Sequence, residues 1–185
     1  RVLSFAYRNF DGAVPEPGEL GEPDRALLDL VEGSFETIGA LIDACKLRAA
    51  LTETLNVARE VNRYLDEQAP WFQIKEDRAA AARTVYVALR AIDSLKILTN
   101  PFLPFSSQAL HEMLGYEGSI FGRQYVDTFR EETRTHTALC YDGSELVGRW
   151  EPSQLPPGQA LLKPKPLFKK LEPKVVEEEL ARMGT

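Results

Sequence analysis

The feature that most constrains the fold is a run of apolar residues at three- and four-residue intervals between residues 27 and 65. This spacing is typical of amphipathic helices, because it places the apolar side chains on one face. A single helix of about 45 residues would be about 68 Å long, whereas a compact domain of this size has a radius of gyration of about 16 Å. We therefore predict two helices with a turn near Asp43 to Lys46. The two apolar stripes are Leu27, Leu30, Val31, Phe35, Ile38, Leu41, Ile42 and Cys45, then Leu47, Leu51, Leu55, Ala58, Val61 and Leu65.

Further helices are predicted on either side of this run. Pro23 suits the first turn of the first of the two helices. A third helix is predicted from about Asp77 to Thr99, because the Asn100-Pro101 step cannot continue it. A fourth is predicted from Pro104 to Leu114, with Gly115 as its terminating residue. The predicted fold class is all-α, an antiparallel helix bundle over residues 1–115.

Residues 116–150 show no helical period and are predicted to be irregular, with a short hairpin whose turn is Asp142-Gly143. Six of the twelve prolines fall between residues 152 and 173. This stretch is therefore predicted to be extended and polyproline-like, outside the core, within a region of residues 151–185 that ends in a helix. A final helix with the thin apolar stripe Val176, Leu180 and Met183 is expected to dock back on another surface, because so few apolar residues cannot support it alone.

Composition excludes several classes of protein. Hydrophobic residues make up 44% and charged residues 27% of the 185 residues, which is typical of a globular domain. The net charge of -6 argues against binding nucleic acid by charge alone, so an RNA partner must be held locally. No apolar stretch is long enough to cross a bilayer. We expect a cytoplasmic protein with neither a membrane nor DNA as its partner.

The cysteines and histidines indicate no metal site or catalytic nucleophile. Cys45 and Cys140 are far apart, without the spacing of a zinc site or a disulfide framework. Cys45 is expected in the core. His111 and His136 have no partner pattern for catalysis and are expected at the surface or in satisfied core positions.

Trp71 follows Pro70 at the predicted end of the second helix, where little of the chain could cover it. On residue type alone, such a tryptophan is more often a core residue. The alternative is an exposed ring on which a flat ligand stacks. An unpaired base of a single-stranded loop is such a ligand, and arginine side chains would assist by binding base edges or phosphates.

Four separated motifs resemble the α-helical anticodon-binding domain of bacterial methionyl-tRNA synthetases, which are class I enzymes. They are Arg1 with Phe10-Asp11-Gly12, the segment Asn62-Arg63-Tyr64 with Ala69-Pro70-Trp71, the segment Asn100 to Pro104, and Leu114-Gly115. The match covers residues 1–115 and returns at Leu167-Phe168. The resemblance implies that Trp71 and Arg1 read the CAU anticodon of methionine tRNA. The Asn that accompanies the Arg in that family would fall before Arg1, and a chain beginning at Arg1 is expected to be a fragment.

Two further residues are weaker candidates for tRNA contact. Arg8 could contact the RNA backbone, although surface charges usually have no specific partner. Asn62 aligns with the stripe at residues 55, 58 and 65, so we expect it at or near the core. It is then either a buried residue that positions Trp71 or a base contact. The run Lys163, Lys165, Lys169 and Lys170 reads as a solvated linker or a backbone contact.

The chain contains neither of the two ATP-binding signature sequences of a class I synthetase and no glycine-rich phosphate loop. The resemblance therefore implies the recognition part of a methionine-tRNA ligase, with catalysis, ATP and magnesium in a separate catalytic domain. One alternative is a helical scaffold that binds protein and no RNA. Another is the anticodon domain of a related synthetase for isoleucine, valine, leucine or cysteine.

Overall fold

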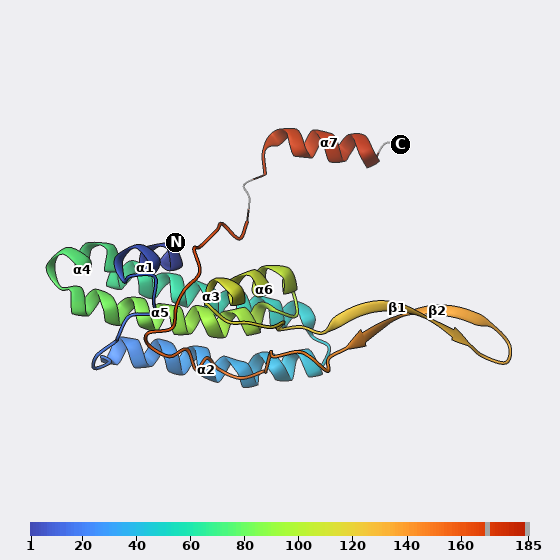
Figure 1. The fold of residues 1–185 in the computed structure, drawn as a ribbon, viewed down its shortest axis with the longest axis horizontal. Helices are drawn as coiled ribbons and strands as arrows, with labels where there is room; N and C mark the ends of the chain where they lie inside the picture. The colour runs from blue at the N-terminus through green and yellow to red at the C-terminus, as the bar shows by residue number, and fades with distance from the viewer. Residues whose placement is uncertain (169–170, 184–185) are drawn as a thin grey trace.

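The computed structural model describes residues 1–168 and 171–183, and its elements follow one another in the order α1, α2, α3, α4, α5, α6, β1, β2 and α7 (Figure 1). A mostly helical body carries a two-stranded hairpin at one end. The bounds are α1 Val2–Asn9, α2 Glu22–Asp43, α3 Leu47–Gln68, α4 Pro70–Glu76, α5 Arg78–Thr99, α6 Pro104–Met113, β1 Arg123–Arg130, β2 Thr135–Asp142 and α7 Pro173–Met183.

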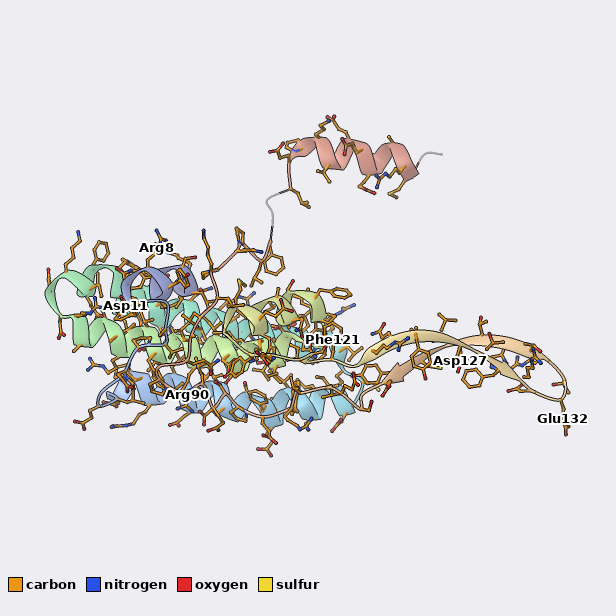
Figure 2. The ribbon with its side chains drawn as sticks, viewed as in Figure 1. Arg8, Asp11, Arg90, Phe121, Asp127 and Glu132 are labelled. Carbon is orange, nitrogen blue, oxygen red and sulfur yellow. The ribbon has the colours of Figure 1, made fainter. Side chains whose placement is uncertain are left out.

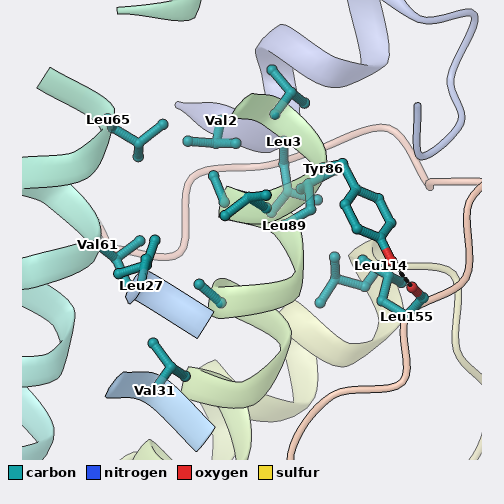
Figure 3. Close-up of a cluster of buried hydrophobic side chains, with 14 of the residues drawn as sticks. Val2, Leu3, Leu27, Val31, Val61, Leu65, Tyr86, Leu89, Leu114 and Leu155 are labelled. Carbon is teal, nitrogen blue, oxygen red and sulfur yellow. Dashed lines mark hydrogen bonds between the residues drawn. The ribbon is translucent and has the colours of Figure 1, made fainter. Parts of the chain in front are cut away.

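The long helices α2, α3 and α5 pack against one another and enclose the core (Figure 3). The predicted turn is confirmed: α2 ends at Asp43, α3 begins at Leu47, and Cys45 between them has a φ of 56°. That turn exposes Cys45, so its expected place in the core is wrong. The predicted third and fourth helices are present as α5 and α6, with the Asp77 side chain accepting the Ala80 N–H as an N-cap.

The apolar stripe of α3 differs from the predicted one in its first half. Leu47, Leu51 and Leu55 are exposed, and the buried row is Ala50, Thr54, Val57, Val61, Tyr64 and Leu65. The helix is therefore rotated by about one residue from the predicted face. This rotation turns Asn62 outward and leaves it exposed, so the expectation of a buried Asn62 is wrong.

A buried carboxylate joins the three long helices. Asp24 of α2 accepts a hydrogen bond from the Tyr64 hydroxyl of α3 at 2.5 Å and pairs with Arg83 of α5 at 3.2 Å. The Asp24 carboxylate also accepts the Gly21 N–H and so caps the start of α2. Burial, and then the bonded Asp24, raise the pKa of Tyr64. A buried polar group that lost its partner would be costly, so these bonds fix the register of the helices.

The hairpin is longer than predicted and turns elsewhere, and its two-stranded sheet makes the all-α expectation wrong in this respect. β1 and β2 pair antiparallel from Arg123 opposite Asp142 to Arg130 opposite Thr135, so the turn comprises residues 131–134. Asp142 and Gly143 lie at the end of β2 instead. Glu132 marks the tip of the hairpin and Phe121 its base in Figure 2. An Asp-Gly pair does not define the hairpin turn by itself, because such pairs also occur where strands end.

The Pro-rich segment is extended as predicted, but it is packed on the helices. Leu155 and Leu161 are 1% and 5% exposed and belong to the core, so the expectation that this segment lies outside the core is wrong. Tyr86 of α5 donates its hydroxyl to the Leu155 carbonyl at 3.4 Å (Figure 3). Ser153 donates its hydroxyl to the buried Asp93 of α5. Prolines suit such a path, because a proline favours an extended backbone and has no N–H that would need a partner.

Asp93 anchors a buried polar cluster. It pairs with Lys96 at 2.5 Å and accepts the Tyr116 hydroxyl at 3.1 Å. The Lys96 ammonium also lies 3.8 Å from the centre of the Tyr116 ring. Burial lowers the pKa of Lys96, although the nearby Asp93 opposes that shift. The cluster ties α5 to the residues after α6 and to the Pro-rich segment.

Helix α7 lies apart from the bundle in Figure 1, and none of its described residues is buried. We predicted that this helix docks back on another surface, but Val176, Leu180 and Met183 are all exposed in this structure. Docking on another surface stays a prediction. Lys169 and Lys170, which belong to the lysine run considered as a linker or an RNA backbone contact, lie outside the described residues. Among the described residues, no helix is long and apolar enough to span a bilayer, and no three His, Cys, Asp or Glu side chains gather as metal ligands.

Candidate nucleic-acid interface

The break between α3 and α4 places Trp71. Ala69 ends α3 in the left-handed region with a φ of 42°, and Pro70 then starts the short helix α4. Proline suits the first position of a helix, because its fixed φ is helical and no N–H is needed there. Pro70 is buried, which fixes the start of α4 against the core. Sequence reasoning missed α4, because seven residues are too few to show a helical period.

Trp71 is half-buried, with one part of the ring packed against the core and the rest accessible. The Arg1 guanidinium lies over this ring, 4.3 Å from its centre. A pocket of about 180 Å³ is lined by Arg1, Val2, Phe5, Arg8, Pro70, Trp71 and Val85. The structure thus brings together three of the four candidate residues: Trp71 of α4, Arg1 at the N-cap of α1, and Arg8 in the last turn of α1.

Helical spacing explains the wall of this pocket that α1 supplies. Residues 1, 5 and 8 follow one another at four- and three-residue intervals and so share a face. Arg8 is exposed and donates its Nε–H to the Ser4 carbonyl at 3.0 Å, which holds the side chain along the helix. Figure 2 shows Arg8 on the outer side of α1. Val85 of α5 lies on the bundle side of this pocket and is buried.

Asn62, the fourth candidate, does not line this pocket. Its side chain is exposed on α3 and makes no hydrogen bond or ion pair to any residue in the described part of the chain. It is therefore accessible to a ligand, but it does not support Trp71 in the way that a buried Asn62 would.

A second pocket, of about 430 Å³, adjoins the first and shares Arg1 with it. Sequence reasoning missed this pocket, because the segment that forms one wall was expected to be a solvated linker. The only signal was the weak match at Leu167-Phe168. Its lining residues are Arg1, Leu3, Ser4, Met113, Pro164, Lys165, Pro166, Leu167 and Phe168.

Solved structures with this fold define the class of protein. The chain is similar to the methionyl-tRNA synthetase of Mycobacterium tuberculosis in its free state, with 26% identity and a TM-score of 0.70. That alignment covers 94% of this chain and 31% of the synthetase chain. The same enzyme bound to methionyl-adenylate gives a TM-score of 0.68 over 91% of this chain. The fold is that of a helical domain of an aminoacyl-tRNA synthetase.

A family model for the anticodon binding domain of methionyl tRNA ligase matches residues 14–138, more than half of the chain. The chain therefore belongs to this family of anticodon-binding domains. It is 55% identical to a methionine-tRNA ligase of Chloroflexus aggregans and 51% identical to one of Thermomicrobium roseum. Each alignment covers 99% of this chain but only 30% and 32% of those proteins, so the chain spans about three tenths of their length.

Proposed function

We propose that this chain binds the CAU anticodon loop of methionine tRNA, with Trp71 stacking on a loop base and Arg1 contacting a base edge or phosphate. The observation that carries the proposal is the pocket in which an accessible indole lies beside two arginines and no acidic side chain. Bases of single-stranded loops are bound by stacking on aromatic rings and by hydrogen bonds to their edges. The net charge of -6 makes this local grip necessary.

Relative energies decide how a base would meet the Arg1 side chain that already covers Trp71. A cation–π contact at an exposed site contributes about 0.5 to 1 kcal/mol. Stacking of a base on an aromatic ring contributes about 1 to 3 kcal/mol. A base therefore displaces the Arg1 guanidinium from the ring, and the freed guanidinium donates to the edge or phosphate of that nucleotide. Arg1 acts as a cover for Trp71 when RNA is absent.

Arg8 and Asn62 have weaker roles in this proposal. Arg8 borders the same pocket and carries a charge that no described carboxylate pairs with, so a phosphate contact suits it. Asn62 is exposed, and its amide could contact a base or ribose. Because it lies outside the pocket, its loss should weaken binding less than the loss of Trp71.

The aminoacylation reaction is assigned to the part of the protein outside this chain. We propose that the whole protein is a cytoplasmic methionine-tRNA ligase, in which a catalytic domain binds methionine, ATP and magnesium. The anticodon-binding domain formed by the present chain holds the anticodon so that the acceptor end of the tRNA reaches the catalytic domain. The proposal rests on relatives named methionine-tRNA ligase that are more than three times as long as the aligned region. It includes neither a membrane nor DNA as a partner.

Binding of RNA stem-loops tests the proposal. The chain should bind a methionine tRNA anticodon stem-loop and should prefer it to a stem-loop with a changed CAU. Trp71→Ala should weaken this binding by about 1 to 3 kcal/mol, or roughly 5- to 150-fold. A protein scaffold would bind neither RNA, and a related synthetase would prefer the changed loop. Equal binding to both loops would also contradict the proposal.

A further inference from the structure

The second pocket has the composition of a nucleotide subsite. Its walls carry one aromatic ring, Phe168, and two cationic side chains, Arg1 and Lys165, and none of its lining residues is acidic. Phe168 is 66% exposed, so the ring is accessible to a stacking partner. Neither Lys165 nor Arg1 pairs with a carboxylate of the described residues. An unpaired cation beside an open ring suits a phosphate joined to a base.

The wall that carries Lys165 and Phe168 is fastened to the bundle. Leu161 is buried and donates its N–H to the Gly12 carbonyl at 2.7 Å. Leu162 donates its N–H to the Met113 carbonyl at 3.1 Å, and the Lys165 N–H donates to the Met113 sulfur at 3.2 Å. The segment is therefore held beside the end of α6 in the absence of a ligand. A preformed wall lowers the entropy lost on binding.

Size and position relate this pocket to the first. Its volume of about 430 Å³ falls in the range of about 300 to 1,000 Å³ that is typical of small-molecule sites, whereas the Trp71 pocket of about 180 Å³ falls below it. At α1 and its N-cap, residues 1, 2, 5 and 8 border the first pocket, and residues 1, 3 and 4 border the second. Arg1 is thus the wall between them, and two nucleotides joined by one phosphate would lie on its two sides.

We propose that this second pocket binds the nucleotide next in the loop to the one stacked on Trp71, with Phe168 stacking on its base and Lys165 contacting its phosphate. The inference rests on the proposed function, since it places a second nucleotide of the same single-stranded loop. It gives Arg1 a further role, because Arg1 lines both pockets and its guanidinium, once displaced from Trp71, would lie beside the phosphate that joins the two nucleotides. The Pro-rich segment then belongs to the RNA-binding surface.

Variants of the two exposed residues test the proposal without disturbing the core. Phe168→Ala should weaken binding of the methionine stem-loop by about 5-fold or more, and Phe168→Trp should restore it, because stacking needs a flat ring. Lys165→Ala should lower the slope of log K against log salt by about 0.7, the value for one phosphate of a single strand. Phe105→Ala and Lys46→Ala are matched controls, since both residues are exposed and neither lines either pocket.

A fluorescent base distinguishes failure of the second subsite from failure of the proposed function. With 2-aminopurine placed at successive loop positions, Trp71→Ala should raise the emission of one position and Phe168→Ala that of its neighbour. If the unchanged chain binds and Trp71→Ala weakens it, while the Phe168 and Lys165 variants match their controls, the second subsite is overturned and the proposed function stands. If the unchanged chain binds no stem-loop, both proposals fail.

Discussion

Single residues place the proposed recognition surface. Ala69 adopts a left-handed conformation that L-residues rarely take, and this reverses the chain so that Pro70 starts a new helix. Without that break, α3 would continue through residue 71, and Trp71 would project from the side of α3 instead of lying beside α1. The arrangement depends on Ala69 and Pro70 together, because the first sets the direction and the second anchors it in the core.

His111 is a residue whose protonation should affect stability. It is 5% exposed, its ring stacks on Tyr116, and its Nε2 lies 3.1 Å from the Glu117 carbonyl. Its Nδ1 is buried without a hydrogen-bond partner, and burial lowers the pKa of the imidazole. The folded protein thus disfavours a second proton there, which the unfolded chain accepts near its ordinary pKa of about 6.5.

We therefore predict that stability is fully present above about pH 6.5 and is lost as the pH falls below it, by at most about 1.4 kcal/mol per pH unit from this group. Urea unfolding at about pH 8 and about pH 5.5 would measure the loss. In His111→Gln the loss over this range should be smaller, because the titrating group is gone. Equal losses in both proteins would show that other groups cause the pH dependence.

At the scale of elements, the Pro-rich segment is part of the folded core. Leu155 is 1% exposed and Leu162, seven residues later, is 58% exposed. Leu155→Ala should lower the free energy of unfolding by about 2 to 5 kcal/mol, because it removes buried methyl groups and leaves a cavity. Leu162→Ala should change it by less than about 0.5 kcal/mol, as for most surface substitutions. Denaturant unfolding of both variants checks this, and equal small losses would contradict the packing seen here.

The long helices and their boundaries could be predicted from the sequence, because caps, prolines and helical spacing act locally. The rotation of α3 could not be predicted. Leu47, Leu51 and Leu55 are as apolar as the residues that are buried, and only contact with α2 and α5 selects Ala50, Thr54 and Val57. The same rotation moved Asn62 from its predicted inward position to the surface.

The candidate site was predictable only in part, for a related reason. Trp71 could be singled out because it follows Pro70 in sequence. The contact of Arg1 with Trp71 joins residues 70 positions apart, and the wall formed by Lys165 and Phe168 comes from further along still. Such pairings depend on how the elements pack, which composition and spacing do not determine. Prolines indicated an extended path for the last segment, but not that helices would bury its leucines.

At the scale of the whole molecule, the hairpin and the proposed interface lie at opposite ends. β1 and β2 project beyond the bundle, whereas α1 and α4 lie at its other end (Figure 1). Every residue of β1 is exposed, and β2 is exposed or half-exposed throughout. An isolated two-stranded hairpin is only marginally stable, so the hairpin adds little to the stability of the bundle.

We predict that the hairpin contributes neither to the stability of the helical bundle nor to RNA binding. Replacing residues 125–140 by an Asn-Gly turn keeps the pair Gln124 and Tyr141 at the base, and with it the bond from the Gly122 N–H to the Tyr141 hydroxyl. The shortened protein should match the unchanged one in free energy of unfolding within about 0.5 kcal/mol and in stem-loop affinity. Loss of affinity would place part of the RNA-binding surface on the hairpin.

The fluorescence of Trp71 itself reports whether a loop base stacks on this ring. The chain has two tryptophans, and Trp150 is held by an edge contact with Phe35 and by a bond from its Nε1–H to the Phe35 carbonyl. In Trp150→Phe, Trp71 is the only tryptophan, so its emission can be followed by itself. Titration with the methionine stem-loop should quench this emission in step with binding, because a base stacks on the ring, whereas Trp71→Phe should show no such quenching from Trp150. Binding that leaves the Trp71 emission unchanged would contradict the proposed stacking of a base on this ring.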